Sequence, residues 1–474
     1  MQIVNHPAHG LLAAAFSAFV LAACVSVPPI DPSRLPATPA AFKEGDAKWT
    51  ASAPAEAQPR GTWWKAFADP QLDRLVERAA NENNSIQVAA ARLAQARALV
   101  RSTQADRSVQ VNARASAVRE KDPVTGVTNP TTLIRAGADL SYEVDLFGRL
   151  KQATNAAALD AGASEALLQD TRLLVQANVA QAYFALRALD VERNLVRETV
   201  AAHRDTLRLT ESRHRAGDAA ELDVVRVSSE AAATESEALA LDRQRATLEH
   251  ALAVLVGAVA SNFELDTADW TTLLPLIPAG VPSTVLARRP DVSAAQRSMM
   301  AAQARVGIAH AAWFPDLLLT GSAGYASPEL GDLFKWSART WGIGALASLP
   351  IFDGGRREAR VQSASAELDA ALATYRDQVL VAFKDVEDQL ASLRLLADQS
   401  EAQSRAVAAA GRATLLSDAR YRNGYVSQLE LLDARRSELR NKREALQVRA
   451  AQYQVTVALV RALGGDWGPM TAQQ

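Results

Sequence analysis

The chain has 474 residues, of which 49% are hydrophobic and 5% aromatic, and alanine is its most frequent residue. This composition is typical of long packed helices rather than of a dense aromatic core. The formal net charge of −2 at pH 7 argues against nucleic acid or an anionic membrane surface as the partner. After the N-terminus no uncharged apolar run reaches eighteen residues, so the sequence predicts no ordinary transmembrane helix.

The N-terminus, residues 1–23, reads as a secretory signal. Leu11–Ala23 is apolar but short for a bilayer span, and Cys24, the only cysteine of the chain, follows it. The small residues before Cys24 resemble the lipobox of bacterial lipoproteins. This resemblance implies cleavage before Cys24, acylation of its thiol and anchoring in outer-membrane lipid. An ordinary secretory signal with a chance cysteine is the alternative. One cysteine allows neither a disulfide framework nor a cysteine metal cage.

One structural unit occurs twice in the remaining chain, at an offset of 207 residues. Gly148 falls on Gly355 and Gly217 falls on Gly424 at this offset. The spacing holds without a gap over more than 100 residues, which chance matching of alanine-rich helices would not readily give. The predicted divisions are an N-terminal segment (24–62), a first repeat (63–257), a linker (258–288), a second repeat (289–464) and a C-terminal tail (465–474).

Each repeat contains a predicted helix followed by a predicted β-hairpin. The helices are expected over 84–106 and 290–312, and the hairpins over 108–146 and 315–351. In 132–146 the even positions are mostly apolar and the odd positions include several charges. A period of two with one apolar face indicates a half-buried strand.

Four strands cannot close into a barrel, because about eight are needed. If the apolar faces meet lipid, open sheet edges are not permitted either, since their backbone groups would lack partners. The sequence therefore favours a barrel that is shared among identical subunits. A sheet packed on helices in a protein outside the membrane is the alternative.

Helical periodicity resumes after Gly148 and Gly355 and continues for nearly 70 residues in each repeat. It stops at Gly217 and Gly424 and then returns. In the returning helices apolar residues recur every seven positions, which is typical of coiled-coil packing. The two glycine-containing breaks are thus predicted to be the tips of long antiparallel helical hairpins. The heptad positions are Leu432, Leu439, Leu446, Tyr453 and Val460 in the second repeat and Val225, Ala232, Leu239, Ala246 and Ala253 in the first.

Together these features resemble the outer-membrane factor family, the TolC-like efflux ducts, in its lipoprotein branch. The stretches that carry the resemblance include "YEVDLFGRLKQA", "SLPIFDGGRREARV" and "RYRNGYVSQLELLDARRSEL". The resemblance implies a mostly α-helical protein with a small β part. In this arrangement a homotrimer forms a twelve-stranded outer-membrane barrel and an α-helical periplasmic tunnel. It also implies a periplasmic adaptor and an inner-membrane pump as partners, no cofactor, and multidrug efflux as the function.

The resemblance places the adaptor-docking surface at the two hairpin tips. It also implies a channel gate just after the second tip, at Leu429, Asp433 and Arg436, with three copies of Asp433 forming an acidic ring. Simple turn formation at the tips, and an ordinary solvated pair of Asp433 with Arg436, are the alternatives. The predicted docking residues are His214, Arg215, Gly217, Tyr421, Arg422 and Gly424.

Enzymatic readings have little support in the sequence. The four histidines after the signal are scattered without metal-ligand spacing, and no phosphate loop or nucleophile elbow is present. We therefore expect no catalytic residues and no metal site. Two other functions stay open at this point: a duct for protein secretion, and a lipid-anchored periplasmic coiled-coil scaffold without a pore.

Overall fold

The computed structural model describes residues 29–39, 41–44, 61–121, 130–275, 286 and 288–465. Cys24, the signal segment, most of the tail and part of the linker therefore lie outside the described residues. The chain divides into two compact units, which we describe separately. Unit 1 contains residues 1–35, 91–165 and 294–377, and unit 2 contains 36–90, 166–293 and 378–474.

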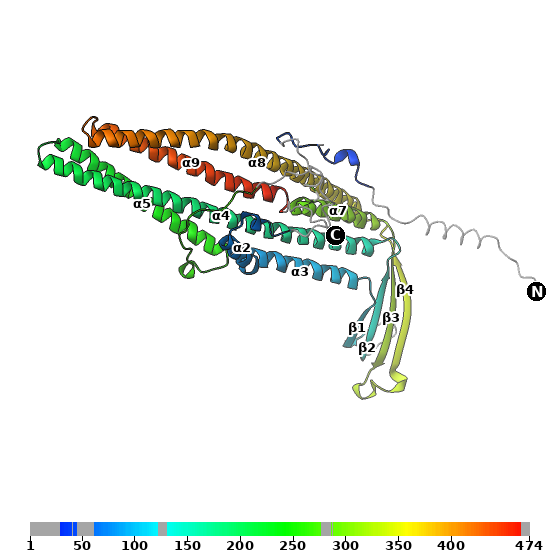
Figure 1. Cartoon of the computed structure of the whole chain (residues 1–474). Helices are drawn as coiled ribbons and strands as arrows, with labels where there is room; N and C mark the ends of the chain where they lie inside the picture. Colours follow the sequence, from blue (N-terminus) through cyan, green and yellow to red (C-terminus); the bar gives the residue numbers. More distant parts are fainter. Residues whose placement is uncertain are drawn as a thin grey trace, which may run out of the picture. The chain divides into compact units, whose positions relative to one another are not determined.

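A four-stranded antiparallel sheet with the order β1-β2-β3-β4 dominates unit 1. Figure 1 shows the four strands side by side, with β1 and β4 at the edges. The central pair joins the two repeats, because β2 belongs to the first and β3 to the second. The strands are β1 (Gln110–Glu120), β2 (Thr131–Val144), β3 (Asp316–Ser327) and β4 (Arg339–Ser348).

The strand registers bring the predicted apolar rows onto one face of the sheet. Across the four strands Ala113 lies opposite Ala138, Ala138 opposite Ala323, and Ala323 opposite Trp341. Because side chains alternate between the two faces of a sheet, the other predicted apolar positions of each strand lie on this same face. β4 is exposed along almost its whole length, so no helix of the described chain covers it. This argues against the alternative of a sheet packed on helices.

The strands end slightly earlier than predicted, at Val144 and Ser348 rather than at 146 and 351. The next residues are needed to start the long helices. The Asp145 carboxylate accepts hydrogen bonds from the backbone N–H groups of Leu150 and Lys151, at 3.0 and 2.7 Å. In the second repeat the carboxylate of Asp353 accepts from the N–H groups of Gly355 and Arg357. Each carboxylate thus caps a helix N-terminus, where the backbone N–H groups lack partners.

Two pairs of long helices confirm the predicted duplication. α4 (Arg149–Arg215) and α8 (Arg356–Arg422) have 67 residues each, about 100 Å at 1.5 Å per residue. α5 (Glu221–Leu255) and α9 (Gln428–Ala462) have 35 residues each. Shorter helices, α2 (Pro70–Glu82), α3 (Asn84–Ala105) and α7 (Pro290–Ala311), complete the main elements. None of the described helices combines the length and the hydropathy of a bilayer-crossing helix.

An aromatic cluster forms part of the core of unit 2. The ring of Tyr453 on α9 lies 4.6 Å from Trp270 of the linker and 4.9 Å from Phe184 on α4. Phe67 lies 4.9 Å from Phe184, and the guanidinium of Arg449 lies over Trp270 at 4.4 Å. Rings at these separations add directional contacts to the burial of a large apolar area. The described part of the linker is therefore fastened to the long helices.

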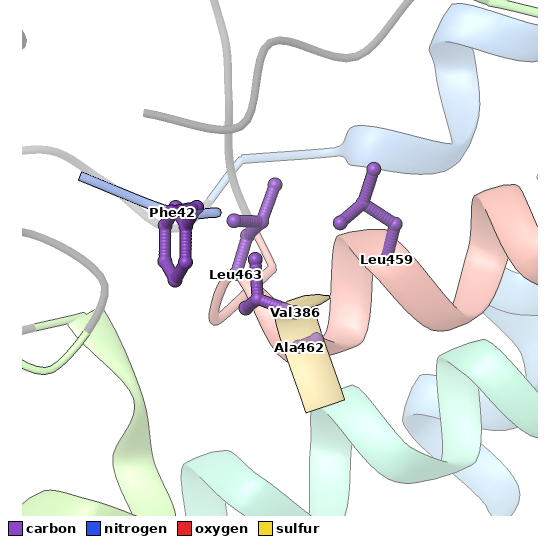
Figure 2. Close-up of a cluster of buried hydrophobic side chains, with 5 residues drawn as sticks. All are labelled: Phe42, Val386, Leu459, Ala462 and Leu463. Atoms are coloured by element: carbon purple, nitrogen blue, oxygen red, sulfur yellow. The ribbon is translucent and has the colours of Figure 1, made fainter. Parts of the chain in front are cut away.

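The N-terminal segment is fixed to the second helix pair in the same unit. Figure 2 shows the side chains of Phe42, Val386 and Leu459 in one buried cluster with Ala462 and Leu463. The carboxylate of Glu387 accepts hydrogen bonds from the backbone N–H groups of Lys43 and Glu44, at 2.7 and 2.9 Å. An apolar anchor and a charge-assisted clamp therefore hold the segment to α8 and α9.

The heptad prediction for α5 is wrong within a single chain. Val225, Ala232 and Leu239 are exposed. α5 packs inside the chain through the opposite face, and Ala238 and Leu241 of that face join Val196 of α4 in a buried cluster. The first three positions of the predicted stripe are therefore free, whereas Ala253, its last position, is buried. The buried stripe consists of Val227, Ala231, Thr234, Ala238 and Leu241.

Candidate functional site: hairpin tips and the start of α9

Both hairpin tips use the same helix-ending turn. At the first tip the N–H of Gly217 donates to the carbonyl of His214, and the N–H of Asp218 donates to that of Arg213. The second tip has the same two hydrogen bonds. The N–H of Gly424 donates to the carbonyl of Tyr421, and the N–H of the next residue donates to the carbonyl of Arg420. The turn needs a left-handed residue, and the two glycines have φ of 83° and 76°. The structure thus explains both glycines by backbone geometry.

The side chains at the tips differ between the repeats. Nδ1 of His214 lies 2.9 Å from the carbonyl oxygen of Ala219 and closes the first loop. Tyr421 is only 7% exposed, and the guanidinium of Arg213 lies 5.0 Å from its ring centre. Tyr421, one of the predicted docking residues, therefore contacts the other hairpin and has little surface exposed for a partner protein.

Sequence reasoning missed Tyr425, which directly follows Gly424 and is 77% exposed. The repeat carried no signal for it, because the matching residue of the first tip is Asp218. The Arg422 side chain is also exposed and pairs with Asp418 at 2.7 Å. Arg215 makes no ion pair with any described residue.

The predicted gate residues lie near the start of α9, which begins at Gln428 with Ser427 as its cap. Leu429 and Asp433 are exposed. The main partner of Arg436 is not Asp433, whose carboxylate lies 3.8 Å away, but Glu230 on α5. Nε and Nη2 of Arg436 donate to the two oxygens of Glu230, the first at 2.9 Å. This bidentate pair lowers the pKa of Glu230 from its ordinary value.

Two further arginines of α9 tie it to its neighbours in unit 2. Arg435 donates to the hydroxyl of Thr206 on α4 at 2.7 Å and to Asp418 on α8 at 3.0 Å. Arg443 donates to Glu192 on α4 at 2.7 Å and pairs with Glu237 on α5. Hydrogen bonds and ion pairs of these two arginines thus hold α9 to α4, α5 and α8.

His203 lies in a cavity of about 440 Å³ behind these arginines. It is 2% exposed, and its Nδ1 has no hydrogen-bond partner among the described residues. Burial lowers the pKa of His203 from its ordinary value, and Arg435 and Arg436 act in the same direction against the opposing effect of Glu230. The neutral ring is the form that this site accommodates.

Stability should therefore fall on acidification. Because the folded-state pKa of His203 lies below the unfolded value of about 6.5, the unfolded chain binds the proton first, and folding stability decreases as the pH falls below about 6.5. His203→Leu should weaken this dependence in thermal melts at pH 7.5 and 5.5. His250→Leu, on exposed α5 surface, is the control. An equal fall of Tm in His203→Leu and the parent would contradict the assignment.

Within the described residues no cluster of three or more histidine, cysteine or acidic side chains could hold a metal ion. What the site offers is two basic, solvent-facing helical turns and, near the start of α9, an exposed leucine and aspartate beside an arginine that is paired with Glu230.

The duplicated pair of long helical hairpins joined to a small antiparallel sheet is a fold that the chain shares with solved channel proteins of the outer membrane. The family model "Outer membrane efflux protein" matches residues 75–258 and 281–465. The chain belongs to this family. It is accordingly an outer-membrane efflux channel protein.

The similarity to individual relatives extends over nearly the whole chain. The probable efflux pump outer membrane protein TtgC of Pseudomonas putida is 33% identical, with 98% of this chain and 97% of the relative covered. The outer membrane protein OprJ of Pseudomonas aeruginosa is 32% identical at the same coverage. The solved outer-membrane channel OprN superposes with a TM-score of 0.86 at 31% identity, over 94% of this chain and 100% of that one.

Proposed function

We propose that three copies of this chain form the exit duct of a tripartite efflux system. The observation that carries the proposal is the sheet of unit 1, in which β1 and β4 each pair on one side only within the described chain. Two free edges and one continuous apolar face suit a sheet that neighbouring copies complete. Three copies would give 3 × 4 = 12 strands, within the range of outer-membrane barrels.

The remaining segments have structural tasks in this proposal. Acylated Cys24 anchors the mature N-terminus in the outer membrane. The N-terminal segment, the linker and the tail form an equatorial belt on the helices. The contacts of Phe42 with α8 and α9, and of Trp270 with α9, support this role for the first two.

The tips are the proposed docking surface for a periplasmic adaptor. Arg215 and Arg422 supply charge-assisted donors, and Gly217 and Gly424 set the turn that presents them. His214 and Tyr421 support this surface without forming it. His214 closes the loop of the first tip, and Tyr421 contacts Arg213 of the other hairpin. An inner-membrane pump, reached through the adaptor, supplies the energy.

The proposed gate consists of Leu429, Asp433 and Arg436. Three exposed Asp433 side chains around a threefold axis would repel one another and attract cations. The clasp of Arg436 on Glu230 would hold each α9 against its own α5 and keep the opening narrow.

The proposed cargo is small molecules, which pass without chemical change and without a catalytic residue or cofactor. Relatives of similar identity are named for antibiotics in one case and for toluene in another. The pump, rather than the duct, therefore selects the cargo in this proposal.

Deletion of the gene tests the function directly. The deletion strain should accumulate antibiotics or organic solvents and become sensitive to them. A copy of the gene on a plasmid should restore tolerance. If susceptibility stays at the parental level across a broad panel, and the protein is absent from the outer-membrane fraction, the proposal fails.

A further inference from the structure

The apolar face of the sheet carries only two charged side chains among the strand positions that the structure describes. The strand registers define this face, which includes Ala138, Ala323 and Trp341 in one row. The two charges are Arg119, near the end of β1, and Arg339, at the start of β4. Both side chains are exposed, and neither makes an ion pair with any described residue. This face is therefore apolar with two unneutralised positive charges.

Both arginines lie at the end of the sheet where the strands do not continue into helices. β1 follows α3 and β4 leads into α8, so Arg119 and Arg339 occupy the far ends of their strands. In the proposed duct the long helices extend into the periplasm. This end of the sheet then faces the exterior of the cell.

The length of the apolar rows places the two guanidinium groups at the edge of the membrane. Arg119 lies 119 − 111 = 8 residues after Val111, the first apolar position of β1, and Arg339 lies 347 − 339 = 8 residues before Ala347, the last of β4. Eight residues rise about 27 Å along a strand, or about 21 Å along the membrane normal at a tilt of about 40°. The apolar band of outer-membrane barrels is about 25 Å tall, so both arginines lie close to the head groups of the outer leaflet.

Aromatic side chains surround Arg339 and hold its guanidinium. The guanidinium lies over the ring of Trp336, and Nε donates to the carbonyl of Trp336 at 3.0 Å. Beside them the ring of Phe334 meets that of Tyr325 edge-on, with 5.5 Å between the ring centres. Trp336 and Phe334 are 77% and 72% exposed, as is typical of side chains at a membrane–water interface. The two terminal nitrogens of Arg339 have no partner among the described residues.

We propose that Arg119 of one protomer and Arg339 of the next bind a phosphate group of an outer-leaflet glycolipid. The proposal rests on the proposed trimer, in which β1 of one chain pairs with β4 of the next. Adjacent strands lie about 4.8 Å apart, and both side chains leave the same face at the same end. A planar guanidinium binds phosphate oxygens through two parallel hydrogen bonds. Trp336 and Phe334 offer apolar ring faces to the sugars of such a lipid.

The duplication does not account for the two arginines. At an offset of 207, Arg119 corresponds to Ala326, and Arg339 corresponds to Thr132. Each repeat therefore places its own arginine on an edge strand, and association of copies brings the two together. The net charge of −2 describes the whole chain, whereas this face is positive.

Lipid binding to the trimer, purified in detergent, tests the site. The probe is lipid A, a glycolipid with phosphate groups, and its dephosphorylated form is the control for the phosphate. A chelator is present, so that divalent cations cannot bridge phosphates to carboxylates. Native mass measurement should show up to three lipid A molecules per trimer, one for each β1–β4 seam. Binding of the dephosphorylated form should be at least tenfold weaker.

Arg119→Gln and Arg339→Gln should each weaken lipid A binding at least tenfold, whereas Arg339→Lys, which keeps the charge, should retain part of it. Arg135→Gln is the matched control and should bind as the parent does. Arg135 on β2 is also exposed and makes no ion pair with any described residue, but its side chain lies on the opposite face of the sheet. Trimer bands on unheated gels check that each variant assembles.

Equal binding of lipid A by the parent and both glutamine variants would overturn the arginine site. A loss confined to one of the two variants would overturn the shared site at the seam. If phosphatidylglycerol binds the parent as tightly as lipid A, the glycolipid assignment is wrong. In these three cases the trimer and the duct stand. If the protein in the outer membrane is a single chain, the proposed function itself fails.

Discussion

Replacing Arg436 with alanine should make the channel leak. Nε and Nη2 of Arg436 hold Glu230 on α5, and this clasp is lost in the variant. The pair is partly exposed, with Arg436 at 54% and Glu230 at 19%, so we assign about 0.5–1 kcal/mol to each clasp. Three clasps in a trimer then bias closure by about 1.5–3 kcal/mol, a factor of roughly 10 to 100. The open probability of the channel in planar bilayers, and with it the mean ion conductance, should rise accordingly.

The matched control for this variant is Arg440→Ala. Arg440 lies one helical turn further along α9 and makes no ion pair with any described residue. Its conductance should stay at the parental value. Asp433→Ala should have a smaller effect on closure than Arg436→Ala, because its contact with Arg436 is the longer one at 3.8 Å. Equal conductance in Arg436→Ala and Arg440→Ala would remove the gate assignment and leave the fold untouched.

Gly424→Pro should abolish efflux while the protein remains abundant in the outer membrane. Proline fixes φ near −65°, whereas Gly424 has φ of 76°, and its N–H donates to the carbonyl of Tyr421. The variant therefore rebuilds the turn that presents Arg422 and Tyr425. The rest of the fold should survive, because Gly424 is exposed at the end of the hairpin and a side chain there meets no other part of the chain, so the change stays within the turn. Drug susceptibility should equal that of the deletion strain.

Gly424→Asn is the control, since asparagine tolerates the left-handed region better than other residues with a side chain. It should retain most of the parental resistance. If Gly424→Pro is as resistant as the parent, the second tip takes no part in docking. If it vanishes from the membrane fraction, the turn is needed for assembly and docking is not tested by this change.

The arrangement of helices and strands could be predicted because it depends on periodicity. A period of two identified the strands, and the strand registers place their apolar rows on one face. Glycines at equal offsets identified the helix starts and the tips, and all four have positive φ: Gly148, Gly217, Gly355 and Gly424.

The side-chain contacts could not be predicted in the same way. Glu230 has no counterpart in the second repeat, where Ser437 stands, so the duplication gave no sign of the clasp on Arg436. The burial of Tyr421 depends on Arg213 of the other hairpin. Such contacts join residues about 200 positions apart, beyond the reach of local patterns.

The most direct test is a cryo-electron microscopy reconstruction of the protein extracted from the outer membrane in detergent. Three chains around one axis are predicted, with β1 of each chain hydrogen-bonded to β4 of the next and a continuous central passage. A particle with one chain, or a trimer in which β1 and β4 stay unpaired, would contradict the proposal that three copies of the chain share one barrel.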